Sequence, residues 1–250
     1  MLLVSDVHGA ADALARVAET ADTLIVLGDL VNLIDYRTGE GIVSDVVGKD
    51  VVMQISELRA RRRRREATAV WSSATAGRED DVEAAIGTLM EAQYVSIAKA
   101  IEGTTAFVIH GNADRPEMLE RLLPPSARYV DAEVHDIDGW RVGFVGGGIP
   151  RIGTPGEVSS EEMRRKLDAI GPVDILCTHV APDIRTLASD VIGHTRKGSP
   201  EILDYLLEHR PAFHYFGDIH QPIATTWKVG ATTCVNAGYF RATGRGLFHG

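Results

Sequence analysis

The feature that most constrains the fold is an arrangement that occurs five times along the chain. A short apolar run is followed directly by polar residues with ligating side chains. The apolar runs begin at residues 1, 23, 106, 174 and 213, and they lead into the segments DVH, GDLVN, GNAD, THVAP and GDIH. Apolar runs of this length without polar alternation are typical of strands that are buried on both faces of a sheet. We therefore expect a core of buried strands whose carboxyl ends carry the same chemistry.

Segments rich in helix formers lie between these runs. Helices are predicted at 10–21, 116–123, 159–170 and 200–210. The segment Asp81–Glu102 predicts a long helix with one buried face, because its apolar residues recur at intervals of three and four. They are Val82, Ile86, Leu89, Met90, Tyr94, Ile97 and Ile101. Alternating residues around Asp138-Gly139 and within 224–238 predict two hairpins. This alternation of strands and helices indicates an α/β sandwich.

Residues 36–104 are the least regular part of the sequence. Because predicted strands with polar tips flank this region, we expect one domain over residues 1–250 with a helical insertion at about 36–104. The Arg59–Arg65 stretch has no interleaved aromatic residues, so a solvated helix face is the favoured interpretation. Binding of nucleic acid, an anionic substrate or a partner remains an alternative.

The polar residues at the five strand tips indicate metal ligation. They are Asp6, His8, Asp29, Asn112, His179, Asp218 and His220. Mn, Fe and Zn ions accept carboxylate oxygen and imidazole nitrogen together, and two such ions can share a bridging carboxylate. In each Asp-x-His pair, alternate residues of an extended segment would point the same way, so we expect both side chains of a pair to reach one site.

The ordered series D-x-H, GDxxN, GN-x-D, TH-x-x-P and G-x-x-H resembles the calcineurin-like metallophosphoesterase superfamily, from residue 6 to residue 220. The resemblance implies a four-layer αββα sandwich with two mixed sheets, and hydrolysis of phosphate esters by a metal-bridging hydroxide. Carried over by position, Asp6, His8 and His220 would hold one divalent ion. Asn112, His179 and Asp218 would hold a second ion, and Asp29 would bridge the two.

Two positions depart from the family pattern. Ala113 stands where many members have the histidine of GNHD, which assists the leaving group, and such acid catalysis contributes about 10²–10⁴-fold. We assign catalytic roles to Asn112 and Asp114 of the same motif. His194 is a candidate replacement for the missing acid. Asp218 stands where the family usually has histidine. Two dications with three aspartates leave +1 instead of +2, and the added hard oxygen favours Mn²⁺, with Fe or Zn as alternatives.

Composition narrows the function. The formal charge of −9 disfavours long nucleic acid and anionic lipid, which leaves a small phosphate ester as the expected substrate. Two distant cysteines, no membrane-length apolar run and no basic leader segment predict a cytoplasmic protein, and a homo-oligomer is possible. The leading hypothesis is a phosphoesterase acting on small diesters or activated monoesters. The rival is a weakly active or inactive scaffold of the same fold that binds a protein partner.

Overall fold

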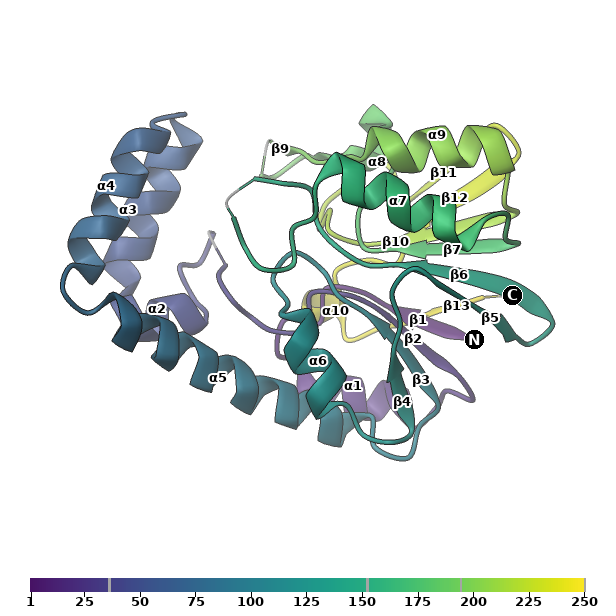
Figure 1. Ribbon diagram of the computed structural model, residues 1–250, viewed down its shortest axis with the longest axis horizontal. Helices are drawn as coiled ribbons and strands as arrows, with labels where there is room; N and C mark the ends of the chain where they lie inside the picture. Colours follow the sequence, from purple (N-terminus) through teal and green to yellow (C-terminus); the bar gives the residue numbers. More distant parts are fainter. Residues whose placement is uncertain (36, 152, 194, 250) are drawn as a thin grey trace.

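Two β-sheets lie face to face between outer layers of helices in the computed structural model (Figure 1). The model describes residues 1–35, 37–151, 153–193 and 195–249. The first sheet has the order β13-β1-β2-β3-β4, formed by Leu247–Phe248, Leu2–Val4, Leu24–Leu27, Ala106–Ile109 and Ala127–Tyr129. The second has the order β11-β12-β10-β7-β6-β5, formed by Thr226–Val229, Thr232–Asn236, Phe213–Phe216, Ile175–Thr178, Trp140–Val145 and Glu133–Ile137. The predicted α/β sandwich with two mixed sheets flanked by helices is confirmed.

Within each sheet, the strands that carry the polar tips run parallel to one another. β1 pairs with β2 and β2 with β3 in the first sheet, and β7 pairs with β10 in the second, each in parallel register. Their carboxyl ends therefore lie at a common edge of each sheet. The two predicted hairpins are present as the antiparallel pairs β5–β6 and β11–β12.

Successive strand residues point to opposite faces, so each sheet contributes to two layers of core. From β1, Leu3 enters the cluster between the two sheets, whereas Leu2 and Val4 pack toward the outer helices. The first sheet is covered by α1 (Ala11–Ala18), α5 (Glu79–Ala100) and α6 (Pro116–Leu122). The second is covered by α7 (Ser160–Ile170) and α9 (Pro200–His209), while α8 (Arg185–Ala188) and α10 (Phe240–Thr243) are single turns. None of the described helices has the length and apolar character needed to cross a membrane.

The long helix predicted from Asp81 is α5, and its buried face is largely as expected. Val82, Ile86, Met90, Tyr94 and Ile97 are buried on it, and Ile101 is buried just beyond its end. Leu89 was assigned to this face wrongly, since 36% of it is exposed. It precedes Met90 by one residue and so points about 100° away around the helix.

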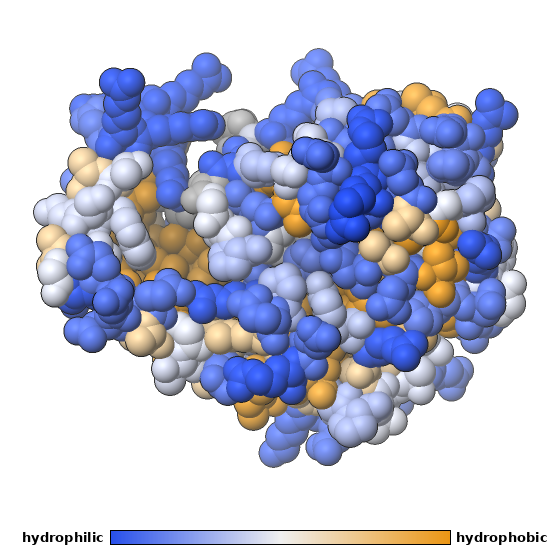
Figure 2. Space-filling view, viewed as in Figure 1, coloured by the Kyte–Doolittle hydropathy of each residue, from blue (hydrophilic) through white to orange (hydrophobic). Residues whose placement is uncertain are grey.

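Within the described residues, the region between β2 and β3 is more regular than its sequence suggests. It forms α2 (Ile42–Val47), α3 (Lys49–Ala60) and α4 (Arg64–Thr75) before α5 begins. The Arg59–Arg65 stretch does not form the expected helix face. It ends α3, makes a turn in which Arg62 has φ 60°, and begins α4. In Figure 1, α3 and α4 lie side by side and project from the sandwich, and Figure 2 shows hydrophilic side chains over their far end.

Candidate metal centre

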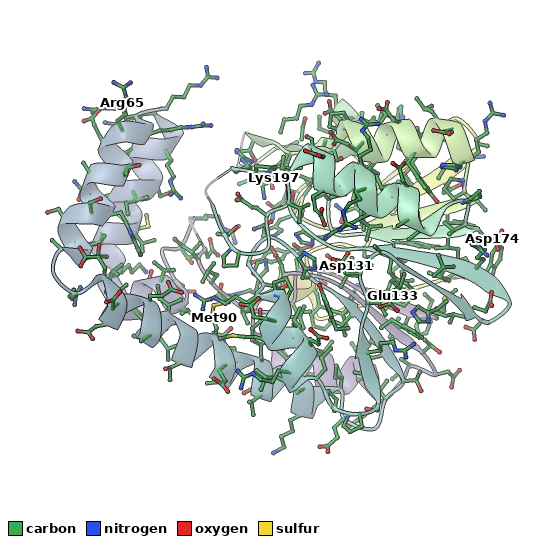
Figure 3. The ribbon with its side chains drawn as sticks, in the orientation of Figure 1. Arg65, Met90, Asp131, Glu133, Asp174 and Lys197 are labelled. Carbon is green, nitrogen blue, oxygen red and sulfur yellow. The ribbon has the colours of Figure 1, made fainter. Side chains whose placement is uncertain are left out.

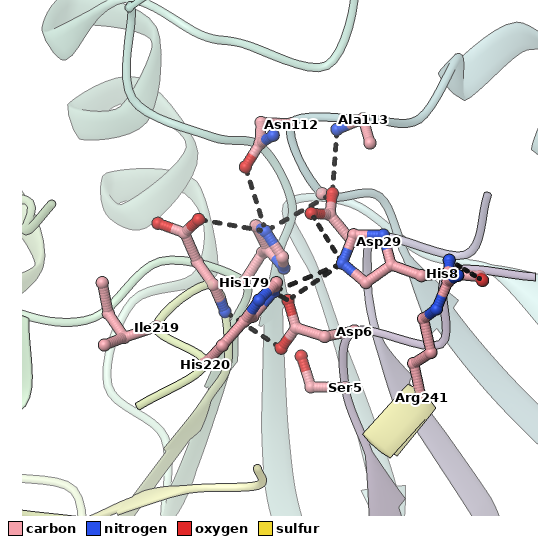
Figure 4. A network of polar contacts seen from close by, with 12 residues as sticks. Ser5, Asp6, His8, Asp29, Asn112, Ala113, His179, Ile219, His220 and Arg241 are labelled. Carbon is pink, nitrogen blue, oxygen red and sulfur yellow. Dashed lines mark hydrogen bonds and ion pairs between the residues drawn. The ribbon is translucent and has the colours of Figure 1, made fainter. Parts of the chain in front are cut away.

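The five strand tips bring the seven predicted ligands into one cluster (Figure 4). Asp6 and His8 follow β1, Asp29 follows β2, and Asn112 follows β3. His179 follows β7 in the facing sheet, and Asp218 and His220 follow β10. A chain of short distances between ring nitrogens and side-chain oxygens connects them, from 3.4 Å for His220 Nε2 to Asp6 Oδ1 up to 4.0 Å for His179 Nε2 to Asp218 Oδ1.

The backbone at the tips is not extended, so the reason given for the Asp-x-His pairs was wrong, although Asp6 and His8 do lie in one group of possible ligands. Asp6, His8, Asp29 and Asp218 have φ values of 57°, 42°, 53° and 61°. Residues other than glycine rarely adopt this left-handed conformation, and it concentrates at functional sites. At these residues the chain turns instead of continuing as a strand. As a result, Asp218 lies beside His179, whereas His220 lies beside Asp6.

The first part of the cluster consists of Asp6, His8 and His220, whose ligand atoms lie within 4.8 Å of one another. The Nε2 atoms of His8 and His220 face each other at 3.3 Å. Asp6 Oδ1 is buried and has no hydrogen-bond partner among the described residues. Two imidazole nitrogens and an unpaired carboxylate oxygen directed at one point are the donor set that a divalent cation satisfies.

The second part lies around His179. Its Nε2 is 3.5 Å from Asp29 Oδ1, and its Nδ1 lies 2.7 Å from the carbonyl oxygen of Leu27. That carbonyl accepts the Nδ1 proton and leaves the Nε2 lone pair directed into the cluster, as in histidines that ligate metals. Asn112 Oδ1 is 3.4 Å from the same Nε2. A half-turn of the amide instead places its nitrogen 3.2 Å from Asp218 Oδ1.

Asp29 lies between the two parts. Its Oδ2 is 3.8 Å from His8 Nε2, and its Oδ1 faces His179. Oδ1 also accepts a hydrogen bond from the Ala113 amide at 2.8 Å. Ala113 is buried, so the position of the missing family histidine contributes a backbone donor that fixes Asp29. Asp29 therefore lies within reach of both parts, and its bridging of two ions stays a prediction.

Asp114 lies behind the cluster. It is fully buried and accepts hydrogen bonds from the amides of Leu30 (3.0 Å) and Gly111 (2.8 Å) and from the Tyr94 hydroxyl (3.1 Å). Burial and the nearby Asp29 charge raise the pKa of Asp114 to about 6. Because its oxygens face the loops after β2 and β3, Asp114 positions these loops. His194, the candidate replacement acid, lies outside the described residues.

Three buried carboxylates give the cluster a strong preference for positive charge. Burial lowers the pKa of His179, but Asp29, Asp6 and Asp218 outweigh this and raise it to about 9. For Asp6, burial is outweighed by His220, His179 and His8, which bring its pKa well below the ordinary value. Burial is the largest influence on His8 and lowers its pKa. Cations are therefore held by this site more readily than anions.

Sequence reasoning missed Lys197, which follows the two-residue strand β9 (Thr195–Arg196) (Figure 3). Its Nζ lies 2.5 Å from Asp218 Oδ1. The signal that could have pointed to a nearby cation is Asp218 itself, since a third buried carboxylate needs a compensating charge. Tyr239 was also missed. Its ring stacks on His220 with centroids 3.9 Å apart, which fixes the plane of that imidazole.

Gly146–Gly148 form a run of three glycines directly after β6. The amides of Gly146, Gly147 and Gly148 donate to Asp131 Oδ1, His110 O and Gly156 O, so none is directed at a ligand. A Cβ at Gly148 would lie 2.3 Å from Asn112 Cβ. The absence of side chains here lets the loop pack against the tip after β3.

Comparisons with solved structures agree with this fold. A solved crystal structure aligns with 96% of this chain and 90% of its own, at a TM-score of 0.60 and 16% identity. The crystal structure of TT1561 of Thermus thermophilus aligns with 96% of this chain and 89% of its own, at a TM-score of 0.56 and 16% identity. At these identities the likeness concerns the fold. No curated protein sequence matched the chain.

The sequence model of the calcineurin-like phosphoesterases matches residues 1–222, which include all five strand tips and the whole cluster. Together with two sheets flanked by helices and Asp/His groups suited to divalent ions, this match shows that the chain belongs to the calcineurin-like phosphoesterase family.

Proposed function

We propose that the protein is a phosphoesterase that uses two divalent metal ions to hydrolyse small phosphodiesters or activated phosphomonoesters. The observation that carries the proposal is the buried Asp6 Oδ1, which lacks a hydrogen-bond partner among the described residues and faces the Nε2 atom of His220. Leaving such an oxygen unpaired costs free energy unless a ligand satisfies it. Activity on phosphate esters fits both the donor set and the family.

In this proposal, Asp6, His8 and His220 would hold one ion, and Asn112, His179 and Asp218 would hold the other. Asp29 has one oxygen near each group and would be a ligand as well. Divalent ions bound here would supply Lewis-acid activation of the phosphate and of the attacking water. The three aspartates add oxygen ligands, which favours Mn²⁺ over Zn²⁺.

The residues of the chain contribute orientation. The carbonyl groups of Leu27 and Val31 fix the rings of His179 and His8 through Nδ1. The Ala113 amide holds Asp29, but the alanine side chain supplies no proton. Substrates whose leaving group needs no acid, such as aryl esters, should therefore be hydrolysed best. The scaffold alternative, a cytoplasmic location, the absence of long nucleic acid as a partner and a homo-oligomer stay predictions.

The test compares two Asp→Asn variants with the same backbone conformation. Asp29 and Asp138 have φ values of 53° and 52°, but Asp138 lies at the β5–β6 turn and pairs with the N-terminal amine. Metal-stripped protein is reconstituted with Mn²⁺ and assayed on a bis-aryl phosphate diester and an aryl monoester. Asp29→Asn should reduce turnover to the level of the metal-free protein, whereas Asp138→Asn should match the wild type. Equal turnover by Asp29→Asn and the wild type would contradict the proposal.

A further inference from the structure

The segment that carries Lys197 is held firmly against the metal centre. The Lys197 amide donates to Ala188 O at 2.8 Å, and the Ser199 amide donates to Ala181 O at 2.9 Å. Between them, a Cβ at Gly198 would lie 2.7 Å from Asp183 Cα, so the backbone here is closely packed. The ammonium group is thus delivered to Asp218 by an ordered backbone.

The contact between Lys197 and Asp218 differs from an ordinary surface ion pair. Asp218 is buried, and Nζ lies 2.5 Å from its Oδ1 and 3.5 Å from its backbone oxygen. Lys197 itself is 27% exposed. The neighbouring pair between Arg196 and Asp183 is more open, with side chains 53% and 33% exposed. An exposed pair contributes little, whereas removing Lys197 leaves a buried carboxylate without its compensating charge.

Asp218 also has contacts within the cluster. Its Oδ1 is 4.0 Å from His179 Nε2 and lies within reach of the Asn112 amide. Asp218 therefore connects Lys197 to the part of the cluster around His179. A change in the charge of Lys197 acts on that part through a single carboxylate.

We propose that Lys197 is a positioning residue that holds the Asp218 carboxylate and offsets its charge, so that the metal-loaded centre keeps enough positive charge to bind a phosphate group. The inference rests on the proposed function. Two dications and three aspartates sum to +1, and the Lys197 ammonium restores +2. A phosphate dianion is attracted about twice as strongly by a charge of +2 as by +1 at equal distance.

If Lys197 has this role, its removal should change the affinities for Mn²⁺ and for phosphate in opposite directions. Without the ammonium group, Asp218 is free to bind a cation, so Mn²⁺ should bind more tightly. The loaded centre is then less positive, so phosphate should bind more weakly. Replacing a residue that only stabilises the fold would weaken the binding of both ligands.

The experiment measures Mn²⁺ binding to the stripped protein and inorganic phosphate binding to the Mn²⁺-loaded protein by calorimetry. For Lys197→Met we expect a Kd for Mn²⁺ lower by about tenfold and a Kd for phosphate higher by about tenfold. Asp218→Asn tolerates the left-handed backbone and should shift both constants the other way. The double variant also lacks the Asp218 carboxylate that would ligate the ion, so it should bind Mn²⁺ more weakly than Lys197→Met does. Arg196→Met, the matched control, should change neither.

If Lys197→Met weakened the binding of both Mn²⁺ and phosphate, or changed neither Kd, the inference would be overturned and the proposed function would still stand. Wild-type protein that takes up no Mn²⁺ would overturn both. If Lys197→Met does not fold, Lys197→Gln decides, because it also removes the charge and should shift the two constants in the same opposite directions. Lys197→Arg keeps the charge and should keep near-native constants, so a folded Lys197→Arg with the shifts of the neutral variant would refute the charge offset.

Discussion

Replacing Gly111 with alanine should disrupt the metal centre more than its single methyl group suggests. Gly111 begins the tip after β3, directly against the tip after β2. A Cβ there would lie 2.2 Å from Asp29 Oδ1, 2.5 Å from Asp29 N and 2.8 Å from His179 Cε1. Ordinary contacts begin at 3.4 Å, so the nearest contact is about 1.2 Å too short. Two of the three neighbouring atoms belong to one predicted ligand, and the third belongs to another.

Neither Asp29 nor His179 can move away from the added methyl group without losing a hydrogen bond. Asp29 Oδ1 is fixed by the Ala113 amide at 2.8 Å, and His179 is fixed by the Leu27 carbonyl at 2.7 Å. Overpacking of a close-packed site costs about 1–3 kcal/mol of stability. A displacement of about 1 Å of a positioned group can cost about 10²-fold in rate. The free energy of unfolding should therefore fall modestly, and turnover should fall much more.

Three measurements check this expectation: urea unfolding, Mn²⁺ titration and turnover of an aryl phosphate ester. Gly87→Ala is the matched control, because Gly87 lies within α5 and its Cβ would meet Arg115 Nη1 at 3.6 Å. That control should gain up to about 1 kcal/mol of stability from helix propensity and keep native metal binding. Gly111→Ala protein with native Mn²⁺ affinity and native turnover would refute the steric argument.

Three further predictions concern stability. Tyr94→Phe removes a buried hydroxyl that donates to Asp114 (3.1 Å) and accepts from the Arg115 amide (2.9 Å). The free energy of unfolding measured in urea should fall by about 1–3 kcal/mol. An unchanged unfolding midpoint would argue against this network. Burial lowers the pKa of His214 from 6.5 to about 3. The stability that its neutral ring contributes is therefore fully present above pH 6.5 and is lost as the pH falls toward 3. In that range the free energy of unfolding should change by at most about 1.4 kcal/mol per pH unit on account of His214. His214→Gln should reduce that slope, and an identical slope would exclude His214 as its source. Mn²⁺ at about 100 times its Kd should stabilise the stripped protein by about 2.7 kcal/mol, raising Tm by roughly 5–10 °C, and Asp29→Asn should show no such rise.

Local pattern and propensity were enough to predict most of the fold. The uninterrupted apolar runs at the five strands predicted burial on both faces. β1, β2 and β7 are buried throughout, whereas Phe107 of β3 and Phe213 of β10 are only half-buried. The spacing of apolar residues predicted α5 but misplaced Leu89, because a periodic pattern defines a face only to within one residue. The helices α2, α3 and α4 carry weaker periodicity, and α3 and α4 pack mainly against each other, so few positions in them are strictly apolar.

The sequence by itself determined the family and the seven residue types at the strand tips, because order and chemical identity are written along the chain. Only the tertiary structure decided how those residues face one another. The left-handed turns at Asp6 and Asp29 depend on contacts between loops, not on local spacing. The pairing of Lys197 with Asp218 joins residues 21 positions apart, and it changes the charge of the centre from what the strand tips alone imply. A sequence lists the charges of a site, but the distances that set their energies exist only once the chain has folded.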